Sequence, residues 1–393
     1  MDKQAIKDYF LYHCPDIPAL KRRITRAKLD SLDRHRISDA EIREAEDDFL
    51  AKERIVKKYM DKFPKYAAAG DLMMEEVLSA APAYQNRDDL EVVRTDMRFC
   101  RFAFGFAMDE YVFFRLEGKS MEERRTYVSS EERIHAAYRM NDFSDMRILN
   151  DKWKTYELLK PYFKRDAILI SNKGDFQKYS EFVRNHPIYV KKRLNLNCGQ
   201  GIELVDTCNC GKSVPQQFDM LLKERKLILE ELIIQQPIMA QFNESSVNTV
   251  RCFTLTTRDG VVPYCGFIRT GRAGAFVDNA GSGGVFATID TQTGHVIAQG
   301  CDEAGGLFAN HPTSGVEFVG FQLPEWDSAR EVCINAAKEL PRLKYIGWDL
   351  AYTEKGWIVV EANMAGQLVH QGSLQRGIKA ELYTMMQNID LIV

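Results

Sequence analysis

The sequence predicts an α+β protein in which a helical N-terminal region, residues 1–145, precedes a domain of mixed helix and sheet, residues 146–393. Charged amphipathic stretches with serine-initiated helix signals fill the first region, which is typical of surface helices. Short apolar runs separated by glycine-containing turns fill the second region, which is typical of packed strands. The chain has 393 residues, 45% of them hydrophobic, so it is long enough to bury the cores of about two or three subdomains.

The N-terminal region carries three helix-start signals that share the Ser-x-x-Glu spacing of a capping box. They are Ser38 with Glu41, Ser120 with Glu123, and Ser129 with Glu132. The first signal opens an amphipathic run that continues to about Phe63, and the other two open short helices. This region predicts helices and offers no residue pattern that indicates chemistry.

The second region predicts helices and strands in alternation. Helices are expected over residues 153–163, 176–185, 324–340 and 374–387, and strands over 167–171, 188–192, 227–234 and much of 248–298.

Composition excludes several classes of protein. The net charge of -3 and the lack of basic patches interleaved with aromatic residues argue against nucleic-acid binding. The sequence has no run of 18 apolar residues, so no transmembrane helix is expected. Nine scattered cysteines and a polar N-terminus without a secretory signal predict free thiols in a reducing cytoplasm.

Two apolar, strand-like runs near the C-terminus are separated by the turn Glu354-Lys355-Gly356. A three-residue hairpin loop that ends in glycine suits a type I turn closed by a left-handed residue, and it would pair Thr353 with Trp357. Counting outward from that pair places Asp349 directly opposite Glu361 on one face of the hairpin. The predicted hairpin therefore brings two carboxylates together.

The two carboxylates and Asn363, two residues further along the same face, form a candidate metal site. Their oxygens are the ligands that a hard cation such as Mg²⁺ prefers, particularly one that also binds phosphates. The alternative is a solvated outer face, but the opposite face is apolar and small residues leave space around the carboxylates. Facing like charges also predict that Asp349→Asn and Glu361→Gln each relieve repulsion and leave the fold near normal.

Two further segments have the character of a nucleotide site. Lys191 lies at the end of an apolar strand, before a loop with Gly199 and Gly201 whose amides could cradle phosphates. The apolar run over 227–234 could offer its backbone to a purine edge. Taken alone, the first segment is better explained by an ordinary surface lysine and loop glycines, and an ordinary buried strand explains the second segment equally well.

Arg251 and Arg269 flank the turn Arg258-Asp259-Gly260. A three-residue loop at this turn would place the two arginines on one face, whereas a two-residue Asp-Gly turn would place them on opposite faces. On one face they would clamp phosphate or carboxylate oxygens with paired hydrogen bonds, and the alternative is surface salt bridges. The sequence leaves both choices open.

Taken together, these segments resemble the nucleotide-binding elements of the ATP-grasp superfamily. The resemblance lies in Asn150-Asp151-Lys152-Trp153-Lys154, Tyr189-Val190-Lys191, Leu229-Glu230-Glu231-Leu232-Ile233, Arg269, Gly347-Trp348-Asp349 and Val360-Glu361-Ala362-Asn363. Further segments are similar to the sugar-transfer-associated ATP-grasp group, namely Ser246-Val247-Asn248-Thr249-Val250-Arg251, Val277-Asp278-Asn279 with Gly283-Gly284, and Ala287-Thr288-Ile289-Asp290. The resemblance covers about residues 100–393 and lies in the order and number of the segments.

The resemblance implies an ATP-grasp fold, in which two α/β subdomains clasp ATP, with an N-terminal lobe and lid over about 146–235 and a C-terminal lobe over 236–393. It also implies the following nucleotide contacts: Lys152 and Lys191 at the phosphates, the loop around Gly199 and Gly201 over them, Glu230, Glu231, Leu232 and Ile233 as the adenine hinge, and Asn248. Relatives often have a ribose-binding acid after the hinge, where this chain has Gln236. Asp349, Glu361 and Asn363 would hold Mg²⁺, and Arg269 with Arg251 would neutralise charge on the transferred phosphoryl group.

The reaction implied by the resemblance is ATP-dependent carboxylate–amine ligation through an acyl phosphate. Its substrates would be a carboxylate and an amine, with sugar-linked substrates among the candidates, and the group is associated with polysaccharide or cell-surface biosynthesis. The alternatives are an ATP-grasp kinase that phosphorylates an acceptor directly and a non-catalytic nucleotide-binding scaffold. The acceptor and the oligomeric state stay open at this point.

Overall fold

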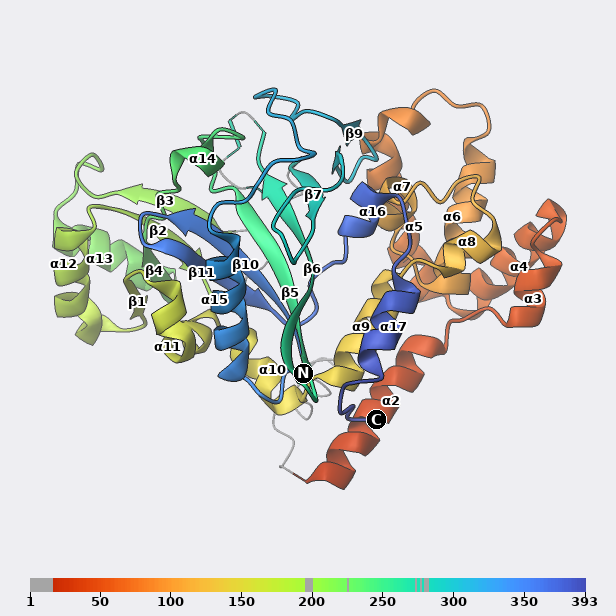
Figure 1. Cartoon of the computed structure of the whole chain (residues 1–393), viewed down its shortest axis with the longest axis horizontal. Helices are drawn as coiled ribbons and strands as arrows, with labels where there is room; N and C mark the ends of the chain where they lie inside the picture. Colours follow the sequence, from red (N-terminus) through yellow and green to blue (C-terminus); the bar gives the residue numbers. More distant parts are fainter. Residues whose placement is uncertain (1–16, 195–200, 225, 273, 276–277, 279–282) are drawn as a thin grey trace.

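The computed structural model describes residues 17–194, 201–224, 226–272, 274–275, 278 and 283–393. Within these residues the strands form two antiparallel sheets flanked by helices (Figure 1). The small sheet has four strands in the order β1-β4-β2-β3, and the large sheet has seven in the order β11-β10-β5-β6-β7-β8-β9. The expected α+β architecture is confirmed.

The N-terminal region is helical throughout its described part. Its elements are α2 (Pro18–Asp33), α3 (Asp39–Glu44), α4 (Phe49–Lys62), α5 (Pro64–Ala80), η1 (Pro82–Tyr84), α6 (Leu90–Phe104), α7 (Met108–Phe113), α8 (Met121–Arg125), α9 (Ser130–Met140) and α10 (Phe143–Leu149). All three predicted capping boxes form, at the starts of α3, α8 and α9. The single helix expected from the first box to Phe63 is wrong, because the Asp48 side chain accepts the Ala51 N–H and starts a second helix.

The elements over residues 152–231 are α11 (Lys152–Phe163), β1 (Ala167–Ile170), η2 (Lys173–Asp175), α12 (Phe176–Asn185), β2 (Ile188–Arg193), β3 (Ile202–Asp206), α13 (Val214–Lys223) and β4 (Leu227–Glu231). The small sheet and the two helices that cover it, α12 and α13, lie together on one side of the molecule (Figure 1), whereas α11 packs into the core of the large sheet. Tyr189, Leu227 and Leu229 share one face of the sheet and pack on Phe182 of α12 and Phe218 of α13. That face is covered, so the opposite face is the one available to a site.

The large sheet occupies the centre of the molecule (Figure 1). The remaining elements are α14 (Pro237–Ala240), β5 (Thr249–Thr257), β6 (Gly260–Thr270), β7 (Val285–Ile289), β8 (Gly300–Cys301), β9 (Leu307–Phe308), α15 (Trp326–Lys338), β10 (Tyr345–Thr353), β11 (Gly356–Asn363), α16 (His370–Leu374) and α17 (Lys379–Met386). The helix expected over 374–387 is wrong at its start, because Gln375 adopts a left-handed conformation that ends α16 and separates it from α17.

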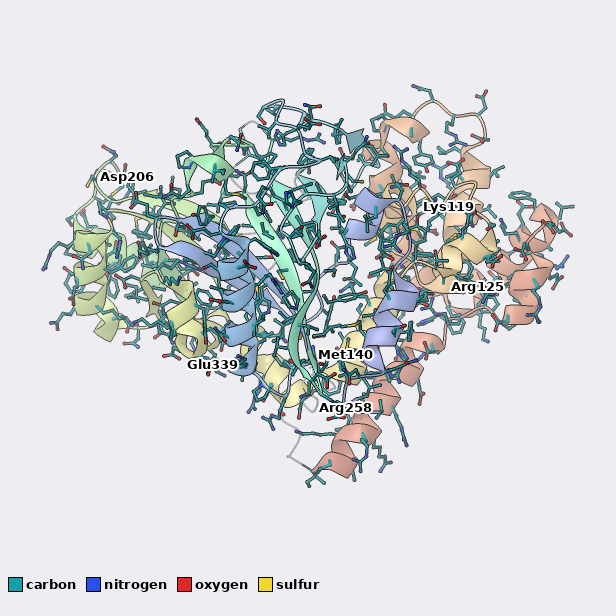
Figure 2. The ribbon with its side chains drawn as sticks, viewed as in Figure 1. Lys119, Arg125, Met140, Asp206, Arg258 and Glu339 are labelled. Atoms are coloured by element: carbon teal, nitrogen blue, oxygen red, sulfur yellow. The ribbon has the colours of Figure 1, made fainter. Side chains whose placement is uncertain are left out.

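The two faces of the large sheet have separate cores. Cys252 and Trp348 pack with Cys333 of α15 on one face. On the other face, Phe253 and Tyr345 belong to a core that the N-terminal helices share with α16 and α17. The C-terminal segment also closes the far end of the sheet, where Arg258 in the β5–β6 turn donates from Nε to Asp390 Oδ1 at 2.9 Å (Figure 2).

The β10–β11 hairpin contains a one-residue bulge. Thr353 pairs with Gly356 and not with Trp357, so the predicted pairing at the turn is wrong. A register shift between Asp349 and Leu350 then leaves Val360 without a partner residue on β10, and Asp349 faces Glu361 as predicted. The connection is one residue shorter than predicted, and the bulge adds one residue to β11. The two changes in register cancel, so Asp349 and Glu361 lie on the same face of the hairpin.

The β5–β6 hairpin has the same construction. Its connection is the two-residue turn Arg258-Asp259, since Thr257 pairs with Gly260. A register shift follows between Phe253 and Thr254 and absorbs one residue of β6. Arg251 and Arg269 therefore lie on one face in spite of the two-residue turn, because the bulge reverses the alternation of side chains.

None of the helices in the described ranges combines the length and apolar character needed to cross a lipid bilayer.

Candidate functional site

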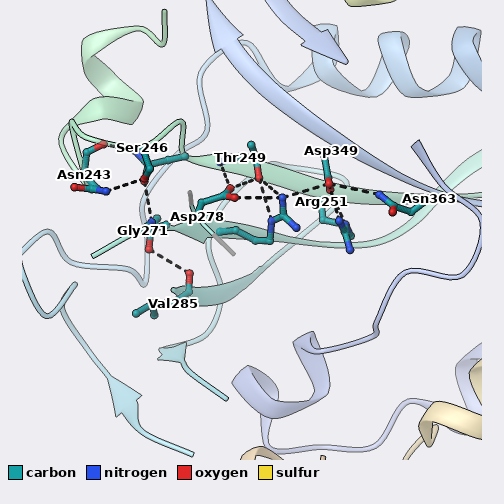
Figure 3. A network of polar contacts seen from close by, with 12 residues as sticks. Asn243, Ser246, Thr249, Arg251, Gly271, Asp278, Val285, Asp349 and Asn363 are labelled. Carbon is teal, nitrogen blue, oxygen red and sulfur yellow. Dashed lines mark hydrogen bonds and ion pairs between the residues drawn. The ribbon is translucent and has the colours of Figure 1, made fainter. Parts of the chain in front are cut away.

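Asp349 is the centre of a polar network on the large sheet (Figure 3). Its side chain is 3% exposed, and Arg251 donates to both of its oxygens, from Nε to Oδ1 and from Nη2 to Oδ2, each at 2.6 Å. Arg269 Nη2 lies 3.3 Å from Oδ2. Burial alone would raise the pKa of Asp349, but the charges of Arg251 and Arg269 outweigh it and lower this pKa, so the carboxylate stays ionised.

Arg269 is held from its other side by a second buried carboxylate. Its Nη2 lies 3.4 Å from Asp278 Oδ1, and its Nε and Nη2 donate to Thr249 Oγ1 at 3.1 and 2.9 Å. The Thr249 hydroxyl in turn donates to Asp278 Oδ2, which also accepts the Thr249 N–H at 3.0 Å. Asp278 was part of the family resemblance in the sequence, but its link to Arg269 was not predicted.

The other two predicted metal ligands, Glu361 and Asn363, lie beside Asp349 in this network. Asn363 Nδ2 lies 3.5 Å from Asp349 Oδ2 (Figure 3), and Glu361 lies opposite Asp349 on the neighbouring strand. Glu361 Oε1 is 3.6 Å from Lys152 Nζ, at the start of α11. The fold thus brings together Lys152, the three predicted ligands and both arginines, from α11, the β5–β6 hairpin and the β10–β11 hairpin.

The donor set fits a hard divalent cation. All three side chains can present oxygens to a cation, provided that the Asn363 amide turns its oxygen and not its nitrogen toward Asp349. The Asp349 oxygens can bind a cation in addition to the arginines, because a carboxylate oxygen accepts from more than one partner. Arg251 and Arg269 lower the pKa of Asp349, so this carboxylate is ionised before a cation binds. The Glu361 side chain is 43% exposed, so one ligand of the set is accessible from solvent.

The small sheet contributes a charged cluster that the sequence did not predict. Glu230 is buried, and its Oε2 accepts from Lys192 Nζ at 2.9 Å and from Arg165 Nη2 at 2.8 Å. Burial alone would raise the pKa of Glu230, but Arg165 and Lys192 lower it to about 2. Val190 pairs with Glu230, so Lys192 and Glu230 share the face opposite to the one that α12 and α13 cover.

Lys191, the predicted phosphate-binding lysine, lies on the covered face. Its Nζ is 2.8 Å from each oxygen of Glu224 and 2.9 Å from Glu203 Oε2. The residue is 5% exposed. Strand alternation separates it from its neighbour Lys192, and only the packing of the sheet shows which of the two lysines faces the large sheet.

The predicted hinge residues join the two sheets. Lys355 Nζ in the β10–β11 turn lies 2.9 Å from Glu231 Oε1, and the Gln236 N–H donates to Tyr352 O at 2.9 Å. Leu232 and Ile233 follow β4 without regular secondary structure. Of the two loop glycines, Gly201 has a φ of +70° just before β3, and Gly199 lies outside the described residues.

Asn248 is fully buried, and its side chain bonds protein groups at both ends. Its Nδ2 donates to Asn243 O at 2.7 Å and to Met239 O at 3.0 Å, and its Oδ1 accepts the Gly271 N–H at 3.3 Å. This side chain holds the segment before β5 in place. The structure therefore gives it an architectural role beside Thr249.

A group of metal-ligating type lies at the outer end of the hinge. Asp166, His186 and Glu231 have ligand atoms within 4.8 Å of one another, and His186 Nε2 is 3.0 Å from Asp166 Oδ2. Glu231 already accepts from Lys355 and from the Asp166 N–H. These contacts make the group a hydrogen-bonded network, which the Lys355–Glu231 ion pair joins to the β10–β11 turn.

The described residues thus place a carboxylate pair, two arginines and Lys152 together at the large sheet, with Lys192 on the uncovered face of the small sheet. The chain belongs to the sugar-transfer associated ATP-grasp family, which matches residues 132–387. No curated protein matches the chain.

Solved ATP-grasp ligases are similar at low identity. The ATP-grasp ligase PsnB complexed with a minimal precursor is 11% identical, with a TM-score of 0.39 over 78% of this chain and 74% of that one. The D-alanine-D-alanine ligase from Coxiella burnetii is 10% identical, with a TM-score of 0.36 over 63% and 59%. VanG D-Ala:D-Ser ligase from Enterococcus faecalis is 13% identical, with a TM-score of 0.39 over 62% of each chain. With such low scores, the family match carries the assignment.

Proposed function

We propose that this protein is an ATP- and magnesium-dependent ligase that joins a carboxylate to an amine through an acyl phosphate. The observation that carries the proposal is the buried, ionised Asp349. It faces Glu361 on β11 and accepts hydrogen bonds from Arg251 on β5. Family membership supports ATP as the energy source. The family description, associated with sugar transfer, supports a substrate linked to carbohydrate or cell-surface biosynthesis.

The proposed ATP site lies between the two sheets. Lys152 and Lys192 contact the phosphates, with Lys192 taking the role that the sequence suggested for Lys191, because Lys192 is on the uncovered face of the small sheet. Gly201, and Gly199 outside the described residues, are the proposed glycine contacts to the phosphates. The hinge backbone over 230–233 contacts adenine, and Gln236 is the proposed ribose contact. Asp349, Glu361 and Asn363 are the proposed Mg²⁺ ligands.

The chemistry then needs positioning and charge neutralisation more than a protein nucleophile. A carboxylate oxygen of the substrate attacks the γ-phosphorus of ATP, the bond to the β,γ-bridging oxygen breaks, and ADP leaves with the electron pair. Arg269 and Arg251 stabilise the negative charge on the transferred phosphoryl group. A neutral amine then attacks the acyl carbon, and inorganic phosphate and a proton are released. Bound Mg²⁺ would neutralise phosphate charge and orient the phosphates.

The proposed reaction is tested by supplying the purified protein with Mg²⁺, ATP and a panel of carboxylates and amines. Ligation releases ADP and inorganic phosphate in equal amounts and only when both substrates are present. Phosphate that stays covalently attached to an acceptor would establish a kinase instead. Nucleotide binding without turnover over the whole panel would favour the scaffold alternative.

The cellular setting is part of the proposal. The described cysteines are all free thiols, which supports a reducing cytoplasm.

A further inference from the structure

Arg165 lies between the two sheets and contacts both of them. It follows α11, whose last turn is closed by Lys164 in a left-handed conformation, and it precedes β1. Its side chain is 2% exposed. None of the motifs recognised in the sequence includes this residue.

On the large sheet, Arg165 binds the bulge of β11. Its Nη1 donates to Val359 O at 2.5 Å and its Nη2 to Val360 O at 3.0 Å. Val360 is the residue left over by the register shift, and the next residue is Glu361. The guanidinium therefore satisfies carbonyls at the point where the strand turns Glu361 toward Asp349.

On the small sheet, Arg165 binds the carboxylate that also holds Lys192. Its Nε and Nη2 donate to Glu230 Oε2 at 3.1 and 2.8 Å, and Lys192 Nζ donates to the same oxygen at 2.9 Å. The carboxylate stays ionised because its pKa is lowered to about 2, against the effect of burial, by Arg165 and Lys192. One planar guanidinium thus connects the β11 bulge with the Glu230 carboxylate, which also binds Lys192.

We propose that Arg165 is a positioning residue that sets the relation between Lys192 on the small sheet and Glu361 on the large sheet. The inference rests on the proposed function, in which these two residues bind opposite sides of the ATP phosphates. Arg165 would act on the proposed site through these two residues. Its fork of donors spans a carboxylate and two carbonyls, and a lysine ammonium lacks that geometry.

The structure offers a matched control for this contact. Lys355 also joins the β10–β11 hairpin to β4, through Glu231, at 2.9 Å. Its side chain is 52% exposed, and exposed pairs of this kind contribute little. If Arg165 merely fastened the two sheets together, the loss of Lys355 would weaken ADP binding in the same way as the loss of Arg165.

The experiment measures binding of ADP to the full chain by titration calorimetry, with and without Mg²⁺, for the wild type, R165K, R165M and K355M. We expect R165K and R165M to weaken ADP binding in Mg²⁺ at least tenfold and to reduce the gain in affinity that Mg²⁺ brings. K355M should match the wild type. R165K keeps a positive charge beside Glu230, so it decides the question if R165M does not fold.

A second readout separates positioning from general damage. In the wild-type background, the loss of ADP affinity in the K192M/E361Q double variant should differ from the product of the two single losses, which means that the two residues are coupled. In the R165K background the double loss should equal that product, because the coupling is gone. The inference is overturned if R165K binds ADP as the wild type does, if K355M loses as much affinity, or if the coupling survives in R165K. A wild-type protein that does not bind ADP at all overturns the proposed function, and the inference with it.

Discussion

Arg251 donates to both oxygens of Asp349 at 2.6 Å, directly across the β5–β10 pairing. The pair is buried, and Arg269 adds a second positive charge 3.3 Å from the same carboxylate. The acid at the proposed metal site is therefore held by cations even before any ligand binds. This arrangement keeps Asp349 ionised and places two guanidinium groups beside the proposed metal site.

Replacing Asp349 by Asn should destabilise the protein, contrary to the expectation that removing one of two facing carboxylates relieves repulsion. The change leaves Arg251 buried without its charged partner, and breaking a buried ion pair in this way costs about 3–5 kcal/mol. Glu361→Gln should change the free energy of unfolding by less than about 1 kcal/mol, because the Glu361 side chain is 43% exposed. Urea unfolding measures both values, and equal stability of the two variants would contradict the role of the Arg251 pair.

Both of these variants should lose magnesium-dependent turnover. Each removes one of the proposed metal-binding carboxylates, so phosphate release should fall by at least about a hundredfold, a typical loss when an electrostatic group of a catalytic site is removed. Turnover is measured over a range of Mg²⁺ concentrations with folded protein. Full activity in either variant would show that the metal site has been assigned to the wrong residues.

Asp278→Asn should lower kcat more than it raises KM for ATP. Asp278 orients Arg269 directly and through Thr249, and an arginine that acts on developing charge contributes mainly in the transition state. A loss of about ten- to a hundredfold in kcat is expected. Asp327→Asn is the control, since that side chain is 88% exposed on α15. A rise in KM with unchanged kcat would assign Asp278 to substrate binding instead.

Lys192→Met should weaken ADP binding more than Lys191→Met. Lys192 lies on the uncovered face with Glu230, whereas Lys191 is paired with Glu224 and Glu203 on the helix-covered face. Loss of a charge-assisted phosphate contact costs about 1.5–3 kcal/mol, or about ten- to a hundredfold in affinity. Calorimetry with both variants gives the comparison. A larger loss of ADP affinity for Lys191→Met would show that Lys191, and not Lys192, contacts the phosphates.

Stability should depend on pH through Glu303. Burial, with smaller contributions from Asp109 and Asp302, raises its pKa to about 7 from an ordinary value of 4.5. Between these two values the folded protein keeps a proton that the unfolded chain has released, so the free energy of unfolding falls as pH rises toward 7. Glu303→Gln should remove this contribution.

The measurement for Glu303 is urea unfolding of the wild type and Glu303→Gln at pH 5, 6, 7 and 8. The variant should gain stability relative to the wild type as pH rises, and the gain should level off above pH 7. Glu110, whose pKa burial and Asp109 raise to about 8, stays the same in both proteins and cancels in the comparison. A constant difference between the two proteins over the whole range would contradict the raised pKa of Glu303.

The sequence by itself determined the class of fold, most of the elements and the order of the motifs. Capping boxes and hydrophobic periodicity are local signals, so they predicted α3, α8, α9 and α12 from a few neighbouring residues. The meeting of Asp349 with Glu361 was also predicted, although the reasoning assumed a three-residue turn where the structure has a shorter connection and a bulge.

Only the tertiary structure decided which side chains share a face and which charges they meet. A bulge moves every following side chain of a strand to the other face, and it leaves no clear signal in the sequence. The choice between Lys191 and Lys192 depended on which face of the small sheet packs against α12 and α13. Arg165 acquires its partners Val359 and Glu230 through contacts between segments far apart in the chain, which no local pattern records.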